Sequence, residues 1–474
     1  MSNKMGSGLE GLNATGEAEL PQQFETLDPR STSQWSATFF NAGYGRVVGD
    51  ISPIIKQMSI FESIYNNCMF GNIKIEDGTG FVEANGIVGS GRELVHFEVV
   101  TENTSPLGAY GADTANLEKT FTIDSISTGR KSPKYTEYDI GIVSPYLIKN
   151  NKTKISRSFK MGETASDIAE YIGIMVLEFE EGAPNWARFD VSPTLHEKAI
   201  VVPNWNPFQV LNFLAKNSVS KNGESNYLFF ENNDIFKFMP VDELLAKEPT
   251  RKLALKNMPD KIKINNDITV DNAMMTKYSE NARFNLSDGQ NMGMYGSGIL
   301  AHNILEKWME KYEVIYDGPL DKIMAETIGL NGPEDKQFKD FNTWQHSGLM
   351  SHNYLYNIHH LGEKSHYPLH DMKKTNLRAN IIKFDIPGDT NIFAGNVIQL
   401  MIPTHIHNHN LPEDQYLTGN WLVTAIHHKI SNAGYVCTLE CMKDGFFGDP
   451  DVVIPERAWE TGGYNAYANE FDGI

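Results

Sequence analysis

The sequence has few cysteines and no long apolar run, and each shortage excludes a class of protein. Its 474 residues include only three cysteines, Cys68, Cys437 and Cys441. An odd count without metal-ligand spacing argues against a disulfide framework and predicts reduced, buried thiols in a protein made in the cytoplasm. The longest apolar run, residues 171–177, ends at Glu178. A membrane helix needs roughly 18 such residues, so we expect no membrane insertion.

Basic residues are also in short supply. Lys and Arg number 41 against 60 Asp and Glu, which gives a formal charge of −19. Tight binding to nucleic acid depends on neutralising phosphates, and this balance disfavours it. An acidic or polar wall would instead let DNA slide past without sticking, although a negative total is equally typical of any soluble protein.

The common catalytic motifs are missing as well. The chain contains no Gly-x-Ser-x-Gly, His-Glu-x-x-His or Walker-type Gly-Lys-Ser/Thr. Two carboxylate pairs have the nine-residue interval of phage lysozymes, Glu181 with Asp190 and Glu326 with Asp335. Neither is followed by the threonine that completes that pattern. A Gly-x-Gly-x-x-Gly at residues 6–11 follows no strand, so we predict no nucleotide site there. Taking the sequence as a whole, we expect no cofactor and no enzyme.

Histidine is the compositional exception, since eleven of the fourteen histidines lie between His346 and His428. His405, His407 and His409 alternate, so an extended chain would point them to one side, where imidazoles could ligate zinc, iron or nickel. Prolines at 403 and 412 bracket them as a loop, and no Asp, Glu or Cys lies at a convincing spacing to complete a shell. A solvated loop is therefore the preferred interpretation, and a His-ligated metal-dependent hydrolase is the alternative. The adjacent His427 and His428 would face opposite sides of a strand.

Residues 1–34 are rich in Gly, Ser, Asn and Gln and predict a flexible arm. Residues 35–145 predict a first β-barrel, because five segments alternate apolar and polar residues at the strand period. These segments are 54–64, 69–76, 93–100, 121–127 and 137–144.

Residues 146–255 predict an α/β domain. Thr164 followed by Asp167 is typical of a capping box, and Asn206 followed by Pro207 is typical of a helix start. Aromatic strands at 227–230 and 235–239 predict a hairpin, followed by a short helix at 241–246. The aromatic residues Trp205, Phe208, Phe229, Phe230 and Phe236 could form a sugar-stacking platform, but their spacing favours core positions.

The remaining residues predict a second barrel, 256–300 with 372–447, whose strands include 381–386, 396–402, 419–430 and 434–442. Within it, residues 301–371 predict an excursion that is helical and His-rich, because Ile304 and Trp308, with Leu305, Met309 and Tyr312, form stripes at helical spacing. Residues 448–474 form a tail. The predicted fold class is α+β and mostly β: two antiparallel β-barrels, an inserted α/β domain and a helical excursion.

Several of these segments resemble the baseplate hub proteins of contractile-tailed bacteriophages. The order of strand, basic linker and capped helix at 137–172, EYDIGIVSPYLIKNNKTKISRSFKMGETASDIAEYI, is similar to the end of that family's first tube barrel. Residues 204–245, 291–300 and 395–445 are similar to its later helix and hairpin, its Gly-rich turn and its closing strands. The positions that carry the likeness are Ser144, Pro145, Pro203, Trp205, Pro207, Phe208, Gly293 and Gly296.

The resemblance implies a structural virion protein that assembles in the host cytoplasm as a homotrimer. Two barrels in each subunit would give six similar positions, so that a threefold ring joins a sixfold tail tube, or its initiator protein, to a threefold central spike. The channel would pass the tape measure and then the DNA, and the excursion and tail would contact neighbouring baseplate wedge proteins. Only 26 residues follow Gly448, so we expect the spike to be a separate chain.

Overall fold

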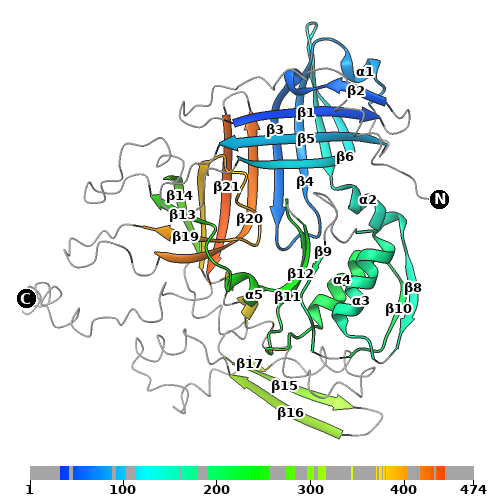
Figure 1. The fold of residues 1–474 in the computed structure, drawn as a ribbon, viewed down its shortest axis with the longest axis vertical. Coiled ribbons are helices and arrows are strands. Elements are labelled where there is room, and N and C mark those ends of the chain that lie inside the picture. The colour runs from blue at the N-terminus through cyan, green and yellow to red at the C-terminus, as the bar shows by residue number, and fades with distance from the viewer. Residues whose placement is uncertain are drawn as a thin grey trace, which may run out of the picture.

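The computed structural model describes most of the two strand-rich blocks and the segment between them. The described residues are 33–41, 46–87, 92–102, 114–160, 162–179, 189–195, 197–233, 235–255, 274–282, 296–303, 308–315, 343–344, 370, 373–375, 377–378, 380–402, 414, 417–431 and 434–443. The structure is mostly β, with a mixed α/β unit beside the sheets (Figure 1). The predicted fold class, α+β and mostly β, is confirmed.

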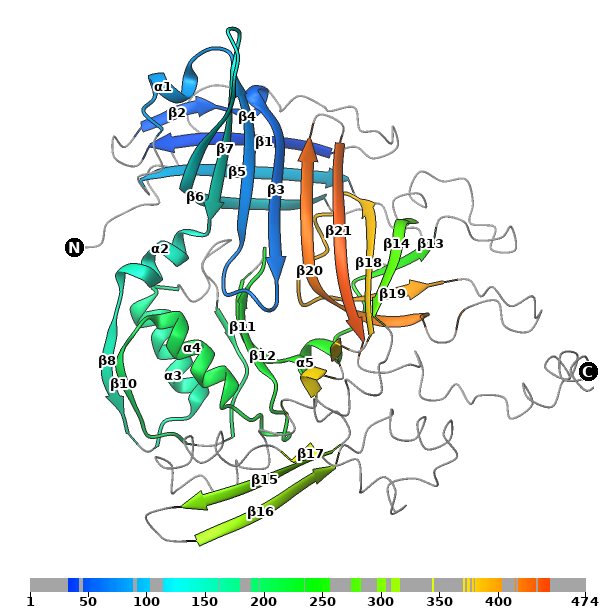
Figure 2. The same cartoon turned by 180° about the vertical axis from the view of Figure 1, so that it is seen from behind.

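The first strand-rich unit consists of two layers whose strands cross. One layer contains β1, β2, β5 and the first half of β6, and the other contains β3, β4 and β7, which run nearly at right angles to it (Figures 1 and 2). The bounds are β1 Ser33–Asn41, β2 Arg46–Asp50, β3 Ile55–Ser63, β4 Phe70–Asp77, β5 Glu93–Glu102, β6 Thr114–Lys131 and β7 Thr136–Val143, with the short helices η2 Ser52–Ile54 and α1 Phe81–Ala84. The five strands predicted here are confirmed, whereas β1 and β2 were not predicted.

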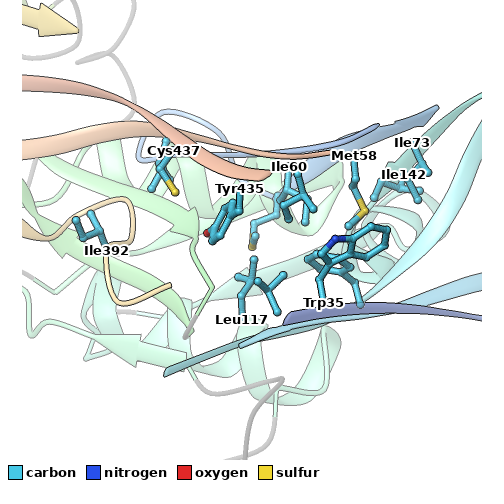
Figure 3. Close-up of a cluster of buried hydrophobic side chains, with 14 of the residues drawn as sticks. Trp35, Met58, Ile60, Ile73, Leu117, Ile142, Ile392, Tyr435 and Cys437 are labelled. Carbon is cyan, nitrogen blue, oxygen red and sulfur yellow. The ribbon is translucent and has the colours of Figure 1, made fainter. Parts of the chain in front are cut away.

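Strand β6 joins the two layers, because it pairs with β5 along its first half and with β7 along its second. Its register against β7 shifts at residues 123–125, where an irregularity bends the strand. Alternating side chains fill the space between the layers. Trp35 and Leu117 of one layer face Met58 and Ile73 of the other (Figure 3).

The middle unit packs helices between two small sheets (Figure 1). A two-stranded sheet, β8 with β10, covers one side of α3 and α4, and a three-stranded sheet, β11-β12-β9, lies on the other. The bounds are α2 Pro145–Lys152, β8 Ile155–Phe159, α3 Ala165–Tyr171, the π-helix η3 Ile172–Val176, β9 Phe189–Val191, β10 Ile200–Trp205, α4 Pro207–Lys216, β11 Tyr227–Glu231, β12 Phe236–Pro240 and α5 Val241–Leu245.

The capping signals in this unit predicted the right helices. The Thr164 hydroxyl accepts a hydrogen bond from the backbone N–H of Asp167, and the Asp167 carboxylate accepts one from the backbone N–H of Thr164. These two bonds form the capping box of α3. Asn206 and Pro207 begin α4. The predicted basic linker after β7 is wrong in one respect, because Pro145 occupies the first turn of helix α2, where its missing N–H costs nothing.

The second strand-rich unit closes into a ring of six strands, in the order β19-β13-β14-β18-β21-β20 with β20 pairing back to β19. The bounds are β13 Arg251–Leu255, β14 Met274–Ala282, β18 Asn380–Pro387, β19 Val397–Met401, β20 Gly419–Ser431 and β21 Gly434–Lys443. The ring is not purely antiparallel as predicted, because β13 runs parallel to both β14 and β19. Strand β13 enters from helix α5 rather than through a hairpin, so nothing forces antiparallel pairing. Its residues fall within the range predicted for the α/β domain.

The excursion from this ring contains strands where we predicted a helix. Strands β15 Gly296–Asn303, β16 Trp308–Ile315 and β17 Thr343–Trp344 form a separate small sheet. The helical prediction is wrong for 308–312, since Trp308, Met309 and Tyr312 lie on β16. A spacing of four residues places side chains on one face of a strand as well as of a helix, so it could not separate the two.

Among the described residues, no helix is long and apolar enough to cross a membrane. The predicted arm up to residue 32 and the predicted tail from residue 448 lie outside the described residues. The domain boundaries themselves remain predictions.

Candidate functional site at the barrel seam

The two strand-rich units meet along one pair of strands, which we call the seam. Residues 57–63 of β3 pair antiparallel with residues 425–431 of β20, so a single sheet of 13 strands runs through both units (Figure 2). One apolar core accompanies it without a break, from Trp35 in the first unit to Trp421 in the second. The seam therefore makes the two strand-rich units one continuous body, and its two faces differ sharply.

The inner face of the seam buries charged and polar groups within this apolar core. Nε2 of His428 on β20 lies 3.4 Å from Oε1 of Glu62 on β3, and both side chains are completely buried. Nδ1 of the same ring is 2.7 Å from the Tyr435 hydroxyl and 3.4 Å from Sγ of Cys437. Tyr435 and Cys437 lie beside the seam in Figure 3.

These neighbours decide the charge of His428. Burial alone would lower the pKa of His428, but the adjacent Cys437 sulfur and the Glu62 carboxylate outweigh it and raise the pKa to about 10. The imidazole is thus a cation at neutral pH, opposite a carboxylate. Tyr435 remains a neutral phenol, because burial raises its pKa well above the usual value. Groups so deeply buried are inaccessible to a substrate, and their geometry suits holding the two strands together.

The outer face of the sheet around the seam is polar and partly exposed. Its strands carry small or charged residues across from one another: Ser59 opposite Asn72, Lys74 opposite Asp139, and Lys429 opposite Ser59. Lys56 pairs with Glu76 at 2.6 Å and with Glu137 at 3.0 Å.

One aromatic row crosses this polar face. The ring of His427 stacks on Phe61 with centroids 4.3 Å apart, and Phe61 stacks on Phe70 at 5.2 Å. His427 and His428 therefore do face opposite sides of their strand, as predicted. This face therefore combines stacked rings with ion pairs.

A second buried ion pair joins the first strand-rich unit to the α/β unit, and we call it the brace. Oε1 of Glu231, at the end of β11, lies 3.4 Å from Nζ of Lys119 on β6, and Oε2 accepts from the backbone N–H of Met69 at 3.1 Å. Burial raises the pKa of Glu231, and Lys119, Met69 and Ser144 offset only part of this. Burial likewise raises the pKa of the neighbouring Cys68 thiol.

The residues that carried the family likeness take structural positions. Ser144 is buried at the N-cap position of α2, and Pro145 is the first residue of that helix. The backbone N–H of Phe208, beside Pro207 in the first turn of α4, donates to the side chain of Asn150 in α2 at 2.8 Å, which ties the two helices together.

Pro203 and Trp205 flank an irregularity in β10, where Asn204 adopts a positive φ of 56°. The Trp205 ring packs against Phe213 at 5.4 Å, and Phe208, Phe229 and Phe236 are buried in one cluster, as their spacing favoured. Gly296 begins β15, and Gly293 lies outside the described residues.

The metal prediction cannot be placed, because His405, His407 and His409 lie outside the described residues. Within the part of the chain that is described, no group of three or more His, Cys, Asp or Glu residues could hold a metal ion.

Sequence reasoning did not find the buried pairs of the seam and the brace. Glu62 follows Met58 and Ile60 at the strand period, so a charged residue stood at an inward position. His428 sits in the same way between Ile426 and Ile430. A charged or titratable residue at an apolar position of a strand was the signal that could have indicated a buried pair. Its partner could not be identified without knowing that β3 pairs with β20.

Comparisons with known proteins agree with this architecture. No protein-family model matches the chain. A curated relative, the probable baseplate hub protein gp334 of Vibrio phage KVP40, is 21% identical over 410 residues, covering 82% of this chain and 90% of the relative.

A solved structure of a prophage tail protein is similar in fold. The 43 kDa tail protein of prophage MuSo2 from Shewanella oneidensis superposes with a TM-score of 0.50 at 10% identity, covering 86% of this chain and 98% of the other. A tail protein from Neisseria meningitidis MC58 gives a TM-score of 0.49 at 11% identity, with 87% and 98% covered.

The fold and the sequence relationship are those of a structural protein of phage tails, a component of the virion. Within that class, the predicted resemblance to baseplate hub proteins is confirmed, because the curated relative is itself named a probable baseplate hub protein.

Proposed function

We propose that three copies of this chain form the ring at the centre of the baseplate, with the outer face of the seam sheet lining an open channel. The observation that carries the proposal is the fusion of two strand-rich units into one sheet through β3 and β20. Three copies would present six such units around an axis, which allows a threefold ring to match a sixfold tube.

The character of the outer face supports its placement toward the channel. A wall that contacts moving DNA must be wettable without carrying a strong positive field, since uncompensated lysines would bind phosphate. On this face Lys56 is paired with Glu76 and Glu137, and Lys383 with Glu440 at 2.7 Å. Paired lysines of this kind would let the tape measure and then the DNA pass without tight binding.

In this arrangement the ring lies between a central spike protein on one face and the tail tube, or its initiator protein, on the other. The excursion and the C-terminal tail contact neighbouring baseplate wedge proteins. Assembly takes place in the host cytoplasm, with no membrane insertion and no catalytic step.

The decisive experiment is a solution mass combined with an electron-microscopy image of the purified chain. A chain of 53.2 kDa should give a particle of about 160 kDa, three times its own mass, with threefold symmetry and a central hole. A stable monomer at high concentration, or a ring with no opening, would overturn the proposal. Deleting residues 448–474 should weaken baseplate assembly while leaving this mass unchanged.

A further inference from the structure

The segment 388–396, between β18 and β19, is partly buried although it belongs to no helix or strand. Asp389 is 5% exposed, and Thr390, Ile392 and Ala394 are 0% exposed. Connecting segments normally run over the surface, because buried backbone groups need partners. We call this segment the linchpin loop, and its partners come from all three structural units.

The loop is anchored first to its own barrel. The N–H of Gly388 donates to the carbonyl of Tyr435 at 2.9 Å, and the N–H of Gly395 donates to the carbonyl of Val423 at 2.8 Å. The Asp389 carboxylate pairs with Nε of Arg251 on β13 at 2.8 Å. These contacts fix both ends of the loop against β20, β21 and β13.

The loop also reaches the first strand-rich unit at two points. The Thr390 and Thr101 hydroxyls lie 2.6 Å apart, which links the loop to the end of β5. The N–H of Ala394 donates to Oε2 of Glu62 at 3.2 Å. Glu62 thus contacts the loop with one oxygen and His428 of the seam with the other.

The third set of contacts belongs to the α/β unit. The fully buried side-chain amide of Asn232, in the turn after β11, donates to the carbonyl of Ala394 at 3.0 Å. The two main-chain groups of Ala394 are therefore taken by two different units: its N–H by the first barrel and its carbonyl by the α/β unit. Gly395 lies close to Phe230 of the same unit, because a Cβ added at this glycine would be only 3.1 Å from Cζ of that ring.

We propose that the linchpin loop couples the three units, so that none of them opens or unfolds without the others. Losing the docking of one unit leaves a buried donor or acceptor of the loop without a partner, which is costly inside an apolar core. Because the loop contacts all three units, separating any one of them leaves such a group unpaired. This coupling is a property of the single chain and does not depend on the proposed ring.

The test is calorimetry combined with hydrogen exchange followed by mass spectrometry on the full chain. The wild type should unfold in one transition, with peptides from β3, β11 and β20 losing protection together at low denaturant. Two variants should break this behaviour. Asn232→Asp keeps the shape and the acceptor to Ile235 but replaces the amide donor that faces Ala394, and Thr390→Val removes the hydroxyl shared with Thr101.

In Asn232→Asp, peptides from β11 and β12 should exchange at least tenfold faster than those from β20, or a second transition should appear. In Thr390→Val, the difference in exchange rate should instead appear between peptides from β5 and peptides from β21. Asn222→Asp, on the exposed surface of the α/β unit, is the control for charge, and Thr390→Ser should restore coupling because it keeps the hydroxyl.

Separate transitions in the wild type would overturn the proposal. So would variants whose peptides all lose protection equally in a single transition. If Asn232→Asp does not fold, the wild type and the pair Thr390→Val and Thr390→Ser still decide the question.

Discussion

The seam and the brace both bury an ion pair between two units, but they hold those units together differently. At the seam, seven residue pairs of a backbone ladder accompany Glu62 and His428. At the brace, β11 belongs to a separate sheet, and the contacts are made by side chains such as Glu231 and Asn67, whose Nδ2 donates to the Phe229 carbonyl at 3.1 Å.

The difference predicts what each ion pair contributes. A backbone ladder can slip by two residues and still keep its hydrogen bonds, so the buried charges of the seam exclude registers in which they are unpaired. The brace has no ladder to align, and it depends on individual side-chain contacts. Disturbing the seam should therefore lower the stability of the whole sheet, whereas disturbing the brace should weaken the packing of the α/β unit on the first strand-rich unit.

The largest effect is expected from Glu62→Gln. This change leaves the His428 cation in the core without a counter-charge, and removing one partner of a buried pair typically costs about 3–5 kcal/mol. Urea denaturation measures the loss in free energy of unfolding. Glu440→Gln is the matched control, because Glu440 pairs with Lys383 on the partly exposed face and should cost less than about 1 kcal/mol. Equal losses in the two variants would contradict the interpretation.

The two junctions should also weaken in different pH ranges. The pKa of His428 is raised from 6.5 to about 10, so its contribution is complete below pH 6.5 and disappears as pH rises toward 10, by at most about 1.4 kcal/mol per pH unit. The pKa of Glu231 is raised from 4.5, so its contribution begins to fall just above pH 4.5.

The difference in free energy of unfolding between wild type and each variant isolates these contributions across pH. His428→Gln should remove the slope between pH 6.5 and 10, and Glu231→Gln should remove the slope that begins just above pH 4.5. A wild-type curve parallel to that of His428→Gln up to pH 10 would show that the seam histidine is not the cation described.

A smaller loss is expected from Gly388→Ala at the start of the linchpin loop. A Cβ at this position would overlap the ring of Tyr435, so the ring or the loop must shift, and overpacking of this kind costs about 1–3 kcal/mol. Gly129→Ala in β6 is the control, since its Cβ would meet Glu137 only at an ordinary 3.5 Å. Thermal unfolding of both variants measures the contrast, and a Gly388→Ala variant as stable as the control would argue against close packing on Tyr435.

Much of this architecture could be predicted from local signals. Strand alternation at Ile73 and Ile75, the capping box at Thr164 and the helix start at Pro207 each depend on neighbouring residues, and the structure has all of them. The opposite directions of His427 and His428 follow from the strand period alone.

The rest depends on pairings between distant residues. Glu62 and His428 are separated by 366 positions, so neither residue identifies the other until β3 lies beside β20. The linchpin loop combines partners at 62, 101, 232 and 251 for the same reason. Strand β16 was missed because the spacing of its apolar residues fits both a helix and a strand. Strand β13 was missed because it joins the second strand-rich unit in parallel, without a hairpin signal.

The smallest expected effect concerns the outer face of the seam. His427→Ala removes the ring that stacks on Phe61 across β20 and β3, and a stacked pair of this kind contributes about 0.5–1.5 kcal/mol beyond its area. Lys429→Ala, two residues further along the same exposed face, is the control and should change stability little. Because the backbone ladder and the inner charges persist, His427→Ala should lower the midpoint of urea unfolding without changing its slope. A changed slope would mean that the outer row, and not only the inner ion pair, keeps the two barrels in one cooperative sheet.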